Sequence, residues 1–377
     1  MLSFRRASTA ACMLLCSAVS SCVPAVEIFA ADPAIIVSDS SIDGAKQPRV
    51  AVDNSGTVFI AFGAGQDIYV CQSVDATNSY SKPKRVAQVP GLALGMRRGP
   101  RIVAGNGWVV VTAISHKSGE LLSWRSDDKG ESWSEAETVN DAEASAREGL
   151  HAMAVGPDGL IVVVWLDHRN QGQQIFGSSS RDGGLTWKPN QKIYASPSGT
   201  VCECCHPSVC IGRNREIYVM WRNSLSGDRD MYLTRSDDGG QTFLDASKLG
   251  TGSWSLNACP MDGGDLAVNQ DGSITTVWRR EKTLFTTRDG KANESMLATG
   301  EQPCIAIGPE SGYLAWVEKR HGALKLLKLG SNTVTVFDER AADPSIGISQ
   351  ARGKPIVVVW ESTGKSGQSI VAATVDQ

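Results

Sequence analysis

Short apolar segments separated by polar turns recur along the chain from about residue 34 to its end. Each unit begins with a short apolar segment, continues through a turn that contains glycine or asparagine, and ends with a stronger apolar segment that often finishes on an aromatic residue. The run Leu-Ile-Val-Val-Val-Trp at residues 160–165 is typical of a strand buried on both faces. Seven segments follow this pattern, and we expect each to form the first two strands of one sheet: residues 48–62, 100–114, 151–165, 207–221, 264–278, 303–316 and 344–360.

A phrase of eight residues, S-x-D-x-G-x-[ST]-[WF], occurs at residues 126–133, 180–187 and 236–243. Aspartate accepts hydrogen bonds from nearby backbone N–H groups, glycine supplies a positive φ, and the Ser or Thr hydroxyl adds local bonds, so the phrase predicts a hairpin turn. We expect the aromatic residue at its end to insert between neighbouring sheets. Repeats about 50 residues apart indicate a propeller or an array.

The phrase resembles the Asp-box of the sialidase-like (BNR-repeat) β-propellers, and this resemblance extends from roughly residue 35 to residue 377. It implies an all-β fold of the sialidase-like β-propeller type. In such propellers the box braces turns on the face away from the active site. The resemblance therefore implies a structural role for Asp128, Asp182 and Asp238.

We expect a single domain of seven four-stranded blades over residues 26–377. The last unit supplies only three strands, at residues 345–349, 356–361 and 369–375. Residues 34–38 have no unit of their own, and pairing them with the last unit would close the ring and remove an exposed sheet edge. Six blades is the alternative, because the fifth and sixth units are short and classical sialidases have six. Residues 26–32 are expected to be dispensable.

The first 25 residues have the pattern of an export signal. Arg5 and Arg6 precede an apolar stretch, residues 10–19, that is too short to span a bilayer. Cleavage after Ala25 would release the mature chain, whereas the lipobox-like sequence ending at Cys22 would leave that cysteine lipidated. We expect an exported protein, periplasmic or extracellular, with no transmembrane segment and with a lipid anchor at Cys22 as the alternative.

The charge of the chain is nearly balanced, with 37 basic and 40 acidic residues. This balance leaves no basic footprint of the kind that binds nucleic acid. We expect a monomer whose ligand is a glycan or another small molecule.

A dense group of cysteines precedes the fourth unit. Residues 201–207 read Val-Cys-Glu-Cys-Cys-His-Pro, and residues 257–264, ahead of the fifth unit, contain Cys-Pro-Met. Because these are equivalent positions on adjacent blades, both loops should meet at one mouth of the central channel. Sulfur and imidazole ligands suit copper or zinc. The candidate metal ligands are Cys202, Cys204, Cys205, His206, Cys259 and Met261.

Disulfides between these loops are the main alternative, since exported proteins commonly use cysteine in this way. A redox-active thiol pair is a further alternative. The run Cys202-x-x-Cys205-His206 also matches covalent haem attachment, although the three-cysteine loop accounts for it without haem. The two loops resemble those of a subset of bacterial sialidase-like propellers with a C-x-C-C loop, and this resemblance implies no particular activity. The cysteines within predicted strands, Cys71, Cys210 and Cys304, are expected to be inert core residues.

The sialidase catalytic set does not transfer to this chain residue by residue. The resemblance would imply three arginines that grip a substrate carboxylate, together with a tyrosine nucleophile. The first of those arginines sits in an Arg-Ile-Pro motif, whereas this chain has Gln47-Pro48-Arg49 at the corresponding place. Candidates chosen by position at the strand entries are Arg98, Arg101, Arg147, Glu148 and Asp262 for catalysis, and Arg49, His151 and Asp343 for binding.

Three classes of function are compatible with these observations. The first is a glycan-active protein, a sialidase-like exo-glycosidase with an incomplete catalytic signature. The second is a non-hydrolytic propeller that binds copper, zinc or a partner through its Cys/His/Met mouth. The third is a purely structural or interaction propeller, because fold alone does not determine function.

Overall fold

The computed structural model describes residues 26–28, 33–38, 41–73, 79–290, 293–364 and 367–375. The expected export signal, residues 1–25, and the lipidation candidate Cys22 lie outside the described residues. The described residues form strands and turns, and they include no helix that could cross a membrane.

Five four-stranded sheets follow one another along the chain, and each keeps the sequence order of its strands, so that hairpins join neighbouring strands. The first blade comprises β3 (Lys46–Val52), β4 (Val58–Ala64), β5 (Asp67–Gln72) and β6 (Lys84–Gln88). The second comprises β7 (Arg101–Ala104), β8 (Val109–Ile114), β9 (Leu121–Ser126) and β10 (Glu137–Thr138). The third comprises β11 (His151–Val155), β12 (Ile161–Asp167), β13 (Gln174–Ser180) and β14 (Gln191–Tyr194). The fourth comprises β15 (Ser208–Ile211), β16 (Ile217–Arg222), β17 (Met231–Ser236) and β18 (Ser247–Lys248), and the fifth β19 (Asp265–Val268), β20 (Ile274–Arg280), β21 (Thr283–Arg288) and β22 (Ser295–Thr299).

Two further blades share one long strand. β26 (Val334–Ile348) pairs with β25 (Gly322–Lys328) through its first part and with β27 (Ile356–Gly364) through its second, and Ala341 pairs with both. β23 (Glu301–Ile307), β24 (Gly312–Val317), β25 and the first part of β26 form the sixth blade. The second part of β26, β27, β28 (Gly367–Val375) and β2 (Ala34–Ser38) form the seventh. The described residues thus form a seven-bladed β-propeller, as the seven apolar units predict.

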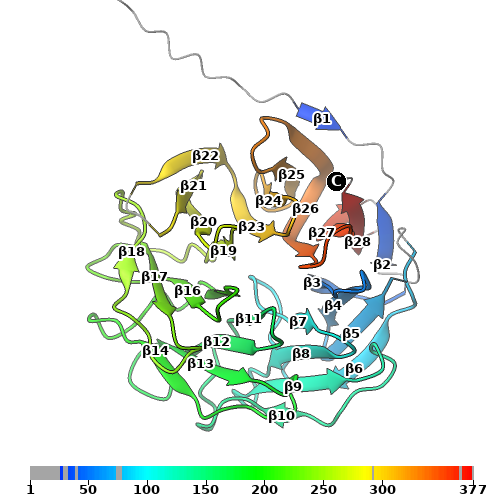
Figure 1. Ribbon diagram of the computed structural model, residues 1–377, viewed down its shortest axis with the longest axis horizontal. Helices are drawn as coiled ribbons and strands as arrows, with labels where there is room; N and C mark the ends of the chain where they lie inside the picture. Colours follow the sequence, from blue (N-terminus) through cyan, green and yellow to red (C-terminus); the bar gives the residue numbers. More distant parts are fainter. Residues whose placement is uncertain are drawn as a thin grey trace, which may run out of the picture.

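The N-terminal strand closes the ring. β2 pairs antiparallel with β28, with Ala34 opposite Ala372 and Ser38 opposite Ser369, so the second described strand lies beside the last one (Figure 1). This pairing confirms the closure predicted from the missing strand of the last unit. Within residues 26–32, which are expected to be dispensable, β1 (Val26–Ile28) pairs in parallel with the first part of β26 and adds a strand outside the sixth blade. This pairing gives the first part of that segment a structural contact, and the effect of its removal stays a prediction.

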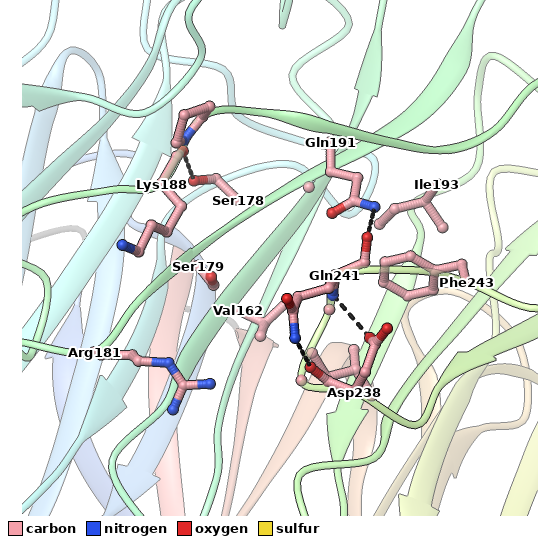
Figure 2. Close-up of a pocket in the computed structure, with 15 residues that line it drawn as sticks. Val162, Ser178, Ser179, Arg181, Lys188, Gln191, Ile193, Asp238, Gln241 and Phe243 are labelled. Carbon is pink, nitrogen blue, oxygen red and sulfur yellow. Dashed lines mark hydrogen bonds between the residues drawn. The ribbon is translucent and has the colours of Figure 1, made fainter.

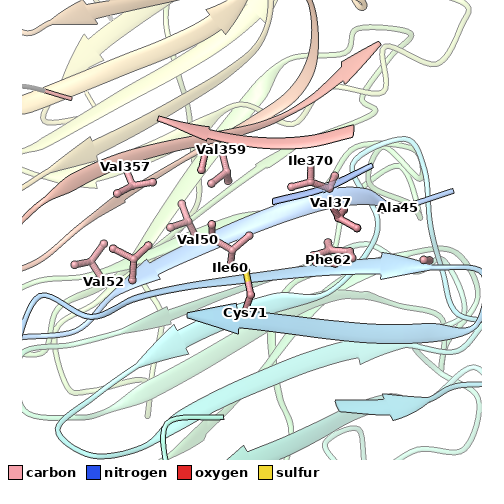
Figure 3. Packing of buried hydrophobic residues seen from close by; sticks show 13 residues of the cluster. Val37, Ala45, Val50, Val52, Ile60, Phe62, Cys71, Val357, Val359 and Ile370 are labelled. Atoms are coloured by element: carbon pink, nitrogen blue, oxygen red, sulfur yellow. The ribbon is translucent and has the colours of Figure 1, made fainter. Parts of the chain in front are cut away.

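The core lies between the faces of adjacent blades. At the closing interface, Val50 and Ile60 of the first blade pack against Val357, Val359 and Ile370 of the seventh (Figure 3). All five side chains are less than a tenth exposed. Burial of an aliphatic side chain of this size contributes about 1.5–3 kcal/mol. This explains why the second strand of each unit reads as an uninterrupted apolar run.

Each Asp-box closes the hairpin between the third and fourth strands of its blade. In the third blade Oδ1 of Asp182 accepts hydrogen bonds from the Ser180 hydroxyl at 2.7 Å and from the Thr186 backbone N–H at 3.0 Å. Trp187 reaches the second blade, where its Nε1–H donates to the Ser123 hydroxyl at 2.9 Å. Because neighbouring strands are antiparallel, this hairpin lies at the opposite end of the blade from the entry of the innermost strand.

Candidate functional site: an arginine-lined chamber and a thiol cluster

The innermost strands of all seven blades surround one polar chamber. It has a volume of about 170 Å³ and receives side chains from β3, β7, β11, β15, β19, β23 and β26. Ligand pockets in proteins usually measure about 300–1,000 Å³, so this chamber can hold a charged group but not a whole sugar ring. Its polar and sulfur-bearing lining consists of Arg49, Arg97, Arg101, Met153, His206, Ser208, Asp265, Cys304 and Ser345.

Three arginines from the first two blades face this chamber. Arg101 is held by backbone carbonyls, since its Nη1 donates to Gly99 O at 2.9 Å and its Nη2 to Arg97 O at 2.6 Å. Arg97 is only 3 % exposed, and its Nε and Nη1 lack a hydrogen-bond partner. Burial and the positive charge of Arg97 lower the pKa of Arg49 to about 10. The three guanidinium groups therefore repel one another and leave buried N–H donors that an anion could satisfy.

Two carboxylates partly balance this positive charge. Burial raises the pKa of Asp265, whose Oδ2 accepts a 3.0 Å hydrogen bond from the Ile305 backbone N–H. Asp343 is fully buried, and its Oδ1 lies 3.9 Å from Nη1 of Arg97. Three arginines against two carboxylates leave the chamber with a positive charge.

A network of buried polar side chains surrounds Asp343 at the strand entries. Gln47 Nε2 donates to Asp343 Oδ2 at 2.7 Å, and Gln302 Nε2 donates to Asp343 Oδ1 at 3.0 Å. All three residues have a positive φ, between 51° and 59°, and each precedes a proline. A non-glycine residue in the left-handed region, which proline further restricts at the preceding position, costs on the order of 1–3 kcal/mol. Residues held in this way are typical of functional sites, and here they fix the rim of the chamber.

Glu361 joins this network from the seventh blade. Its Oε1 accepts hydrogen bonds from the Gln47 backbone N–H at 2.7 Å and side-chain Nε2 at 3.2 Å. Burial, together with the negative charge of Asp343, raises the pKa of Glu361 to about 7. A carboxyl group with such a pKa can carry a proton near neutral pH, which is a property of general acids.

Both histidines at the strand entries are buried. His151 Nε2 lies 3.0 Å from the Thr112 hydroxyl, and His206 Nε2 lies 3.1 Å from Gly264 O. Burial and the charge of nearby arginines hold the pKa of both imidazoles well below the usual range, so both are neutral at pH 7. The Nδ1 atoms of both are buried without a hydrogen-bond partner.

The remaining sequence candidates lie on the rim or in structural contacts. Arg98 Nε donates to Glu148 O at 2.7 Å, and the two side chains form an ion pair at 3.9 Å. Arg147 is exposed, and its carbonyl oxygen lies 2.8 Å from His116 Nδ1. Asp262 is buried, and its Oδ2 accepts a 2.8 Å hydrogen bond from the Gln302 backbone N–H. None of these four side chains is among the described residues that line the chamber.

Three thiols meet in the loop that leads into β15. Cys202 Sγ lies 3.6 Å from the sulfurs of both Cys204 and Cys205, and all three sulfurs lie within 4.8 Å of one another. Cys259, which is exposed on the neighbouring loop, interacts with the thiol of Cys204 but lies outside this group of three. The loop before β15 and the loop before β19 meet as expected. Gly263 of the second loop packs so closely against His206 of the first that an added Cβ would lie 1.9 Å from the carbonyl oxygen of His206. His206 is turned toward the chamber, and the three sulfurs form the group of potential metal ligands that the described residues bring together.

Burial, together with the hydrogen bond with Cys202, raises the pKa of Cys205 to about 12, while the charge of Arg222 acts in the opposite direction.

The three cysteines that the sequence places in the core lie in different surroundings. Cys71 is buried between the first and last blades, whereas Cys304 lines the chamber and Cys210 lies in the next cavity along the channel.

Another cavity, of about 400 Å³, lies between the third blade and the Asp-box of the fourth (Figure 2). Several of its polar groups bind one another. Gln241 N donates to Asp238 Oδ1 at 2.9 Å, Gln191 Nε2 donates to Gln241 O, and the Ser178 hydroxyl donates to Lys188 O at 2.6 Å. The bond from Gln191 to Gln241 joins the third blade to the fourth, and the other two lie within one blade each. The cavity lies at the end of the blades away from the chamber.

Comparison with known proteins places this architecture in a family. Residues 108–325, more than half of the chain, match the family model described as a BNR repeat-like domain. The chain belongs to this family. No curated protein shows significant sequence similarity to it.

Solved structures share the fold of this BNR repeat-like protein at low sequence identity. The α-L-arabinanase of Penicillium chrysogenum is 14% identical, with a TM-score of 0.52 over 91% of this chain and 97% of that enzyme. An ulvan lyase is 11% identical, with a TM-score of 0.54 over 92% and 94% of the two chains. A Hadza microbial sialidase is 14% identical, with a TM-score of 0.54 over 91% of this chain and 68% of that one. The BNR repeat-like protein thus has a sialidase-like propeller fold that glycan-active enzymes also adopt.

The sequence criterion, a charged residue at a strand entry, identified only part of the chamber of this BNR propeller. This criterion selected Arg49 and Arg101, which line the chamber, and Asp343, which supports its rim. It missed Arg97 and Asp265. It also missed Gln47, Gln302 and Glu361, although the recurrence of a polar residue before proline at three strand entries, Gln47-Pro48, Gln302-Pro303 and Asp343-Pro344, was a signal that could have found the first two.

Proposed function

We propose that this protein recognises acidic glycans by binding a carboxylate, or a similar anionic group of the sugar, in the arginine chamber. The observation that carries the proposal is the convergence of Arg49, Arg97 and Arg101 on one small buried space, in which Arg97 retains unpaired N–H donors. Planar guanidinium groups match a carboxylate through paired N–H···O bonds. The volume of about 170 Å³ suits the anionic group alone, so the sugar ring would remain at the mouth.

Recognition without efficient hydrolysis is the form of this function that the site supports best. Among the described residues that line the chamber there is no tyrosine. Asp343 and Glu361 accept hydrogen bonds from Gln47, and Asp265 accepts one from the Ile305 backbone N–H, so the carboxyl groups at the chamber and its rim are restrained. The fold shared with arabinanase, lyase and sialidase structures supports a glycan as the ligand class. The export signal expected at residues 1–25 is consistent with action on glycans outside the cytoplasm.

The test is a calorimetric titration of the mature chain with sialic acid and glucuronate oligosaccharides, with neutral oligosaccharides of equal length as comparison ligands. We expect the acidic ligands to bind and the neutral ones to bind at least about tenfold more weakly, which corresponds to about 1.4 kcal/mol. Arg97→Met should abolish this preference. The control Arg85→Met removes an arginine that lies on the outermost strand of the first blade and is more than half exposed, and it should leave binding unchanged.

An activity assay on a sialoside reporter separates recognition from catalysis. We expect turnover to be weak or absent. Robust turnover that is lost in Arg101→Ala would replace the binding proposal with a glycosidase. Equal affinity for acidic and neutral ligands would contradict the role of the arginine chamber.

A further inference from the structure

The thiol cluster at the mouth has the dimensions of a metal site. Zinc and copper bind thiolate sulfur at about 2.3 Å, and sulfurs arranged tetrahedrally around such an ion lie about 3.8 Å apart. Cys202 Sγ lies 3.6 Å from each of the sulfurs of Cys204 and Cys205. A single ion could therefore contact all three sulfurs with little movement of the loop. All four cysteines of the two loops are free thiols.

A buried positive charge beside the cluster gives a second, independent indication. Arg222 is 1% exposed, and its guanidinium group donates to the carbonyl oxygens of Arg229 at 2.6 Å, Asp262 at 3.0 Å and Arg279 at 2.8 Å. Within the described part of the chain, no carboxylate forms an ion pair with Arg222. Its charge acts instead on Cys205.

Burying an uncompensated charge is costly, so a counter-charge is expected close to it. Thiolates in the cluster would supply that counter-charge. With Cys259 as a fourth thiolate, the four thiolates, one divalent ion and the Arg222 guanidinium group would carry a net charge of −1, against −2 for a monovalent ion, so this balance favours Zn²⁺ over Cu⁺.

We propose that Cys202, Cys204 and Cys205 bind one thiophilic metal ion, preferentially Zn²⁺, as three thiolates beside Arg222, and that Cys259 of the neighbouring loop supplies a fourth ligand. Binding releases the thiol protons to solvent and involves no change in oxidation state. The ion joins the loop before β15 to the loop before β19. It therefore fixes two adjacent blades at the mouth of the chamber.

The experiment uses the mature chain purified anaerobically under reducing conditions. The protein is loaded with Zn²⁺ or with Cu⁺ in separate samples, freed of unbound metal, and examined by elemental analysis with thiol counting in parallel. We expect about one zinc ion per chain, as in other thiolate-rich structural sites. Cys202→Ser/Cys205→Ser should lose the ion, and Cys259→Ser should retain it with weaker affinity. The matched control is Cys71→Ala, which alters a buried cysteine outside the cluster and should bind as the wild type does.

A measurement on the wild type makes the test independent of whether the variants fold. Replacement of the ion by Co²⁺ should produce sulfur-to-cobalt charge-transfer absorption, and removal of zinc by a chelator should lower the melting temperature by several degrees. Reduced protein that binds neither ion would overturn the proposal. So would protein isolated with these cysteines oxidised to disulfides and without metal, or equal loss of metal in Cys71→Ala. Binding of Cu⁺ but not Zn²⁺ would overturn the charge balance assigned to Arg222.

Discussion

The backbone N–H of Gln47 donates a 2.7 Å hydrogen bond to Oε1 of Glu361, and this contact joins the entry of the first blade to the last blade of the ring. Both residues are buried. The charged groups around Glu361 are Asp343, whose negative charge raises its pKa, and Arg320, whose positive charge acts in the opposite direction. The closing interface of the propeller therefore contains a carboxyl group that titrates near neutral pH.

Glu361 should make stability depend on pH. The folded state holds its proton up to about pH 7, whereas the unfolded chain releases it near pH 4.5, so the folded state binds more protons between these values. Stability should accordingly fall as the pH rises from about 4.5 to 7, by at most about 3 kcal/mol for this group. Glu361→Gln should remove this decline in the free energy of unfolding measured by denaturant titration. The exposed Glu135→Gln is the control, and a decline that survives in Glu361→Gln would contradict the assignment.

Arg49→Met should separate stability from binding. The substitution removes a cation that Arg97 and Arg101 repel. It also removes the 2.9 Å hydrogen bond that Arg49 Nη1 donates to Pro48 O. We expect the free energy of unfolding without ligand to stay unchanged or to rise by about 1 kcal/mol, because sites built for binding often store unfavourable interactions. Affinity for acidic glycans should fall. A large loss of stability would show that Arg49 is a structural residue.

The Asp-box of the third blade should contribute stability without affecting the chamber. Asp182→Ala removes three hydrogen bonds, from the Ser180 hydroxyl and from the backbone and hydroxyl of Thr186, and should cost about 1–2 kcal/mol. Gly184→Ala should cost more, because Gly184 has a φ of 86° and an added Cβ would lie 2.8 Å from Val110 Cγ2. Thermal unfolding measures both effects, with the exposed Leu185→Ala in the same turn as control. Loss of ligand binding at unchanged melting temperature would argue against this role.

Truncation at the N-terminus should separate the contribution of β1 to stability from that of β2. A chain that begins at residue 33 loses β1, which pairs only at the outer edge of the sixth blade, and should remain folded with a modest loss of stability. A chain that begins at residue 41 also loses β2 and exposes the β28 edge, which should cause aggregation or a large loss of stability. Light scattering and thermal unfolding measure these outcomes. A stable monomer that begins at residue 41 would disprove closure through β2.

The fold could be predicted from sequence because its signals are local and repeated. A strand buried on both faces needs a continuous apolar run, and each Asp-box turn needs aspartate, glycine and a hydroxyl at fixed spacing. Closure by residues 34–38 followed from counting strands. The merging of the sixth and seventh blades through β26 could not be predicted, because the residues that join them, 339–343, carry the polar and small side chains of an ordinary loop.

The chamber was harder to predict because it depends on the direction of individual side chains. Arg97 and Arg98 are neighbours in one loop, yet Arg97 is buried in the chamber and Arg98 pairs with Glu148 on the rim. The difference follows from the local backbone, in which Arg97 has a φ of 66°. Likewise, His206 follows Cys205 directly but turns to Gly264 instead of the thiols. Such turns are set by contacts between blades, which are distant in sequence.

The continuity of β26 limits where the chain could be reconnected. Between the first five blades, loops link the outermost strand of one sheet to the innermost strand of the next, and a circular permutation there would cut none of the strands. Between the fifth and sixth blades, Gly300 alone separates β22 from β23. Between the sixth and seventh blades, Ala341 pairs with both Gly322 and Ser362, so new termini at this point would cut two sheets at once. The last two blades consequently form one mechanical unit, and a ring opened by force should part at the β2–β28 pairing or at a loop, with these two sheets still joined.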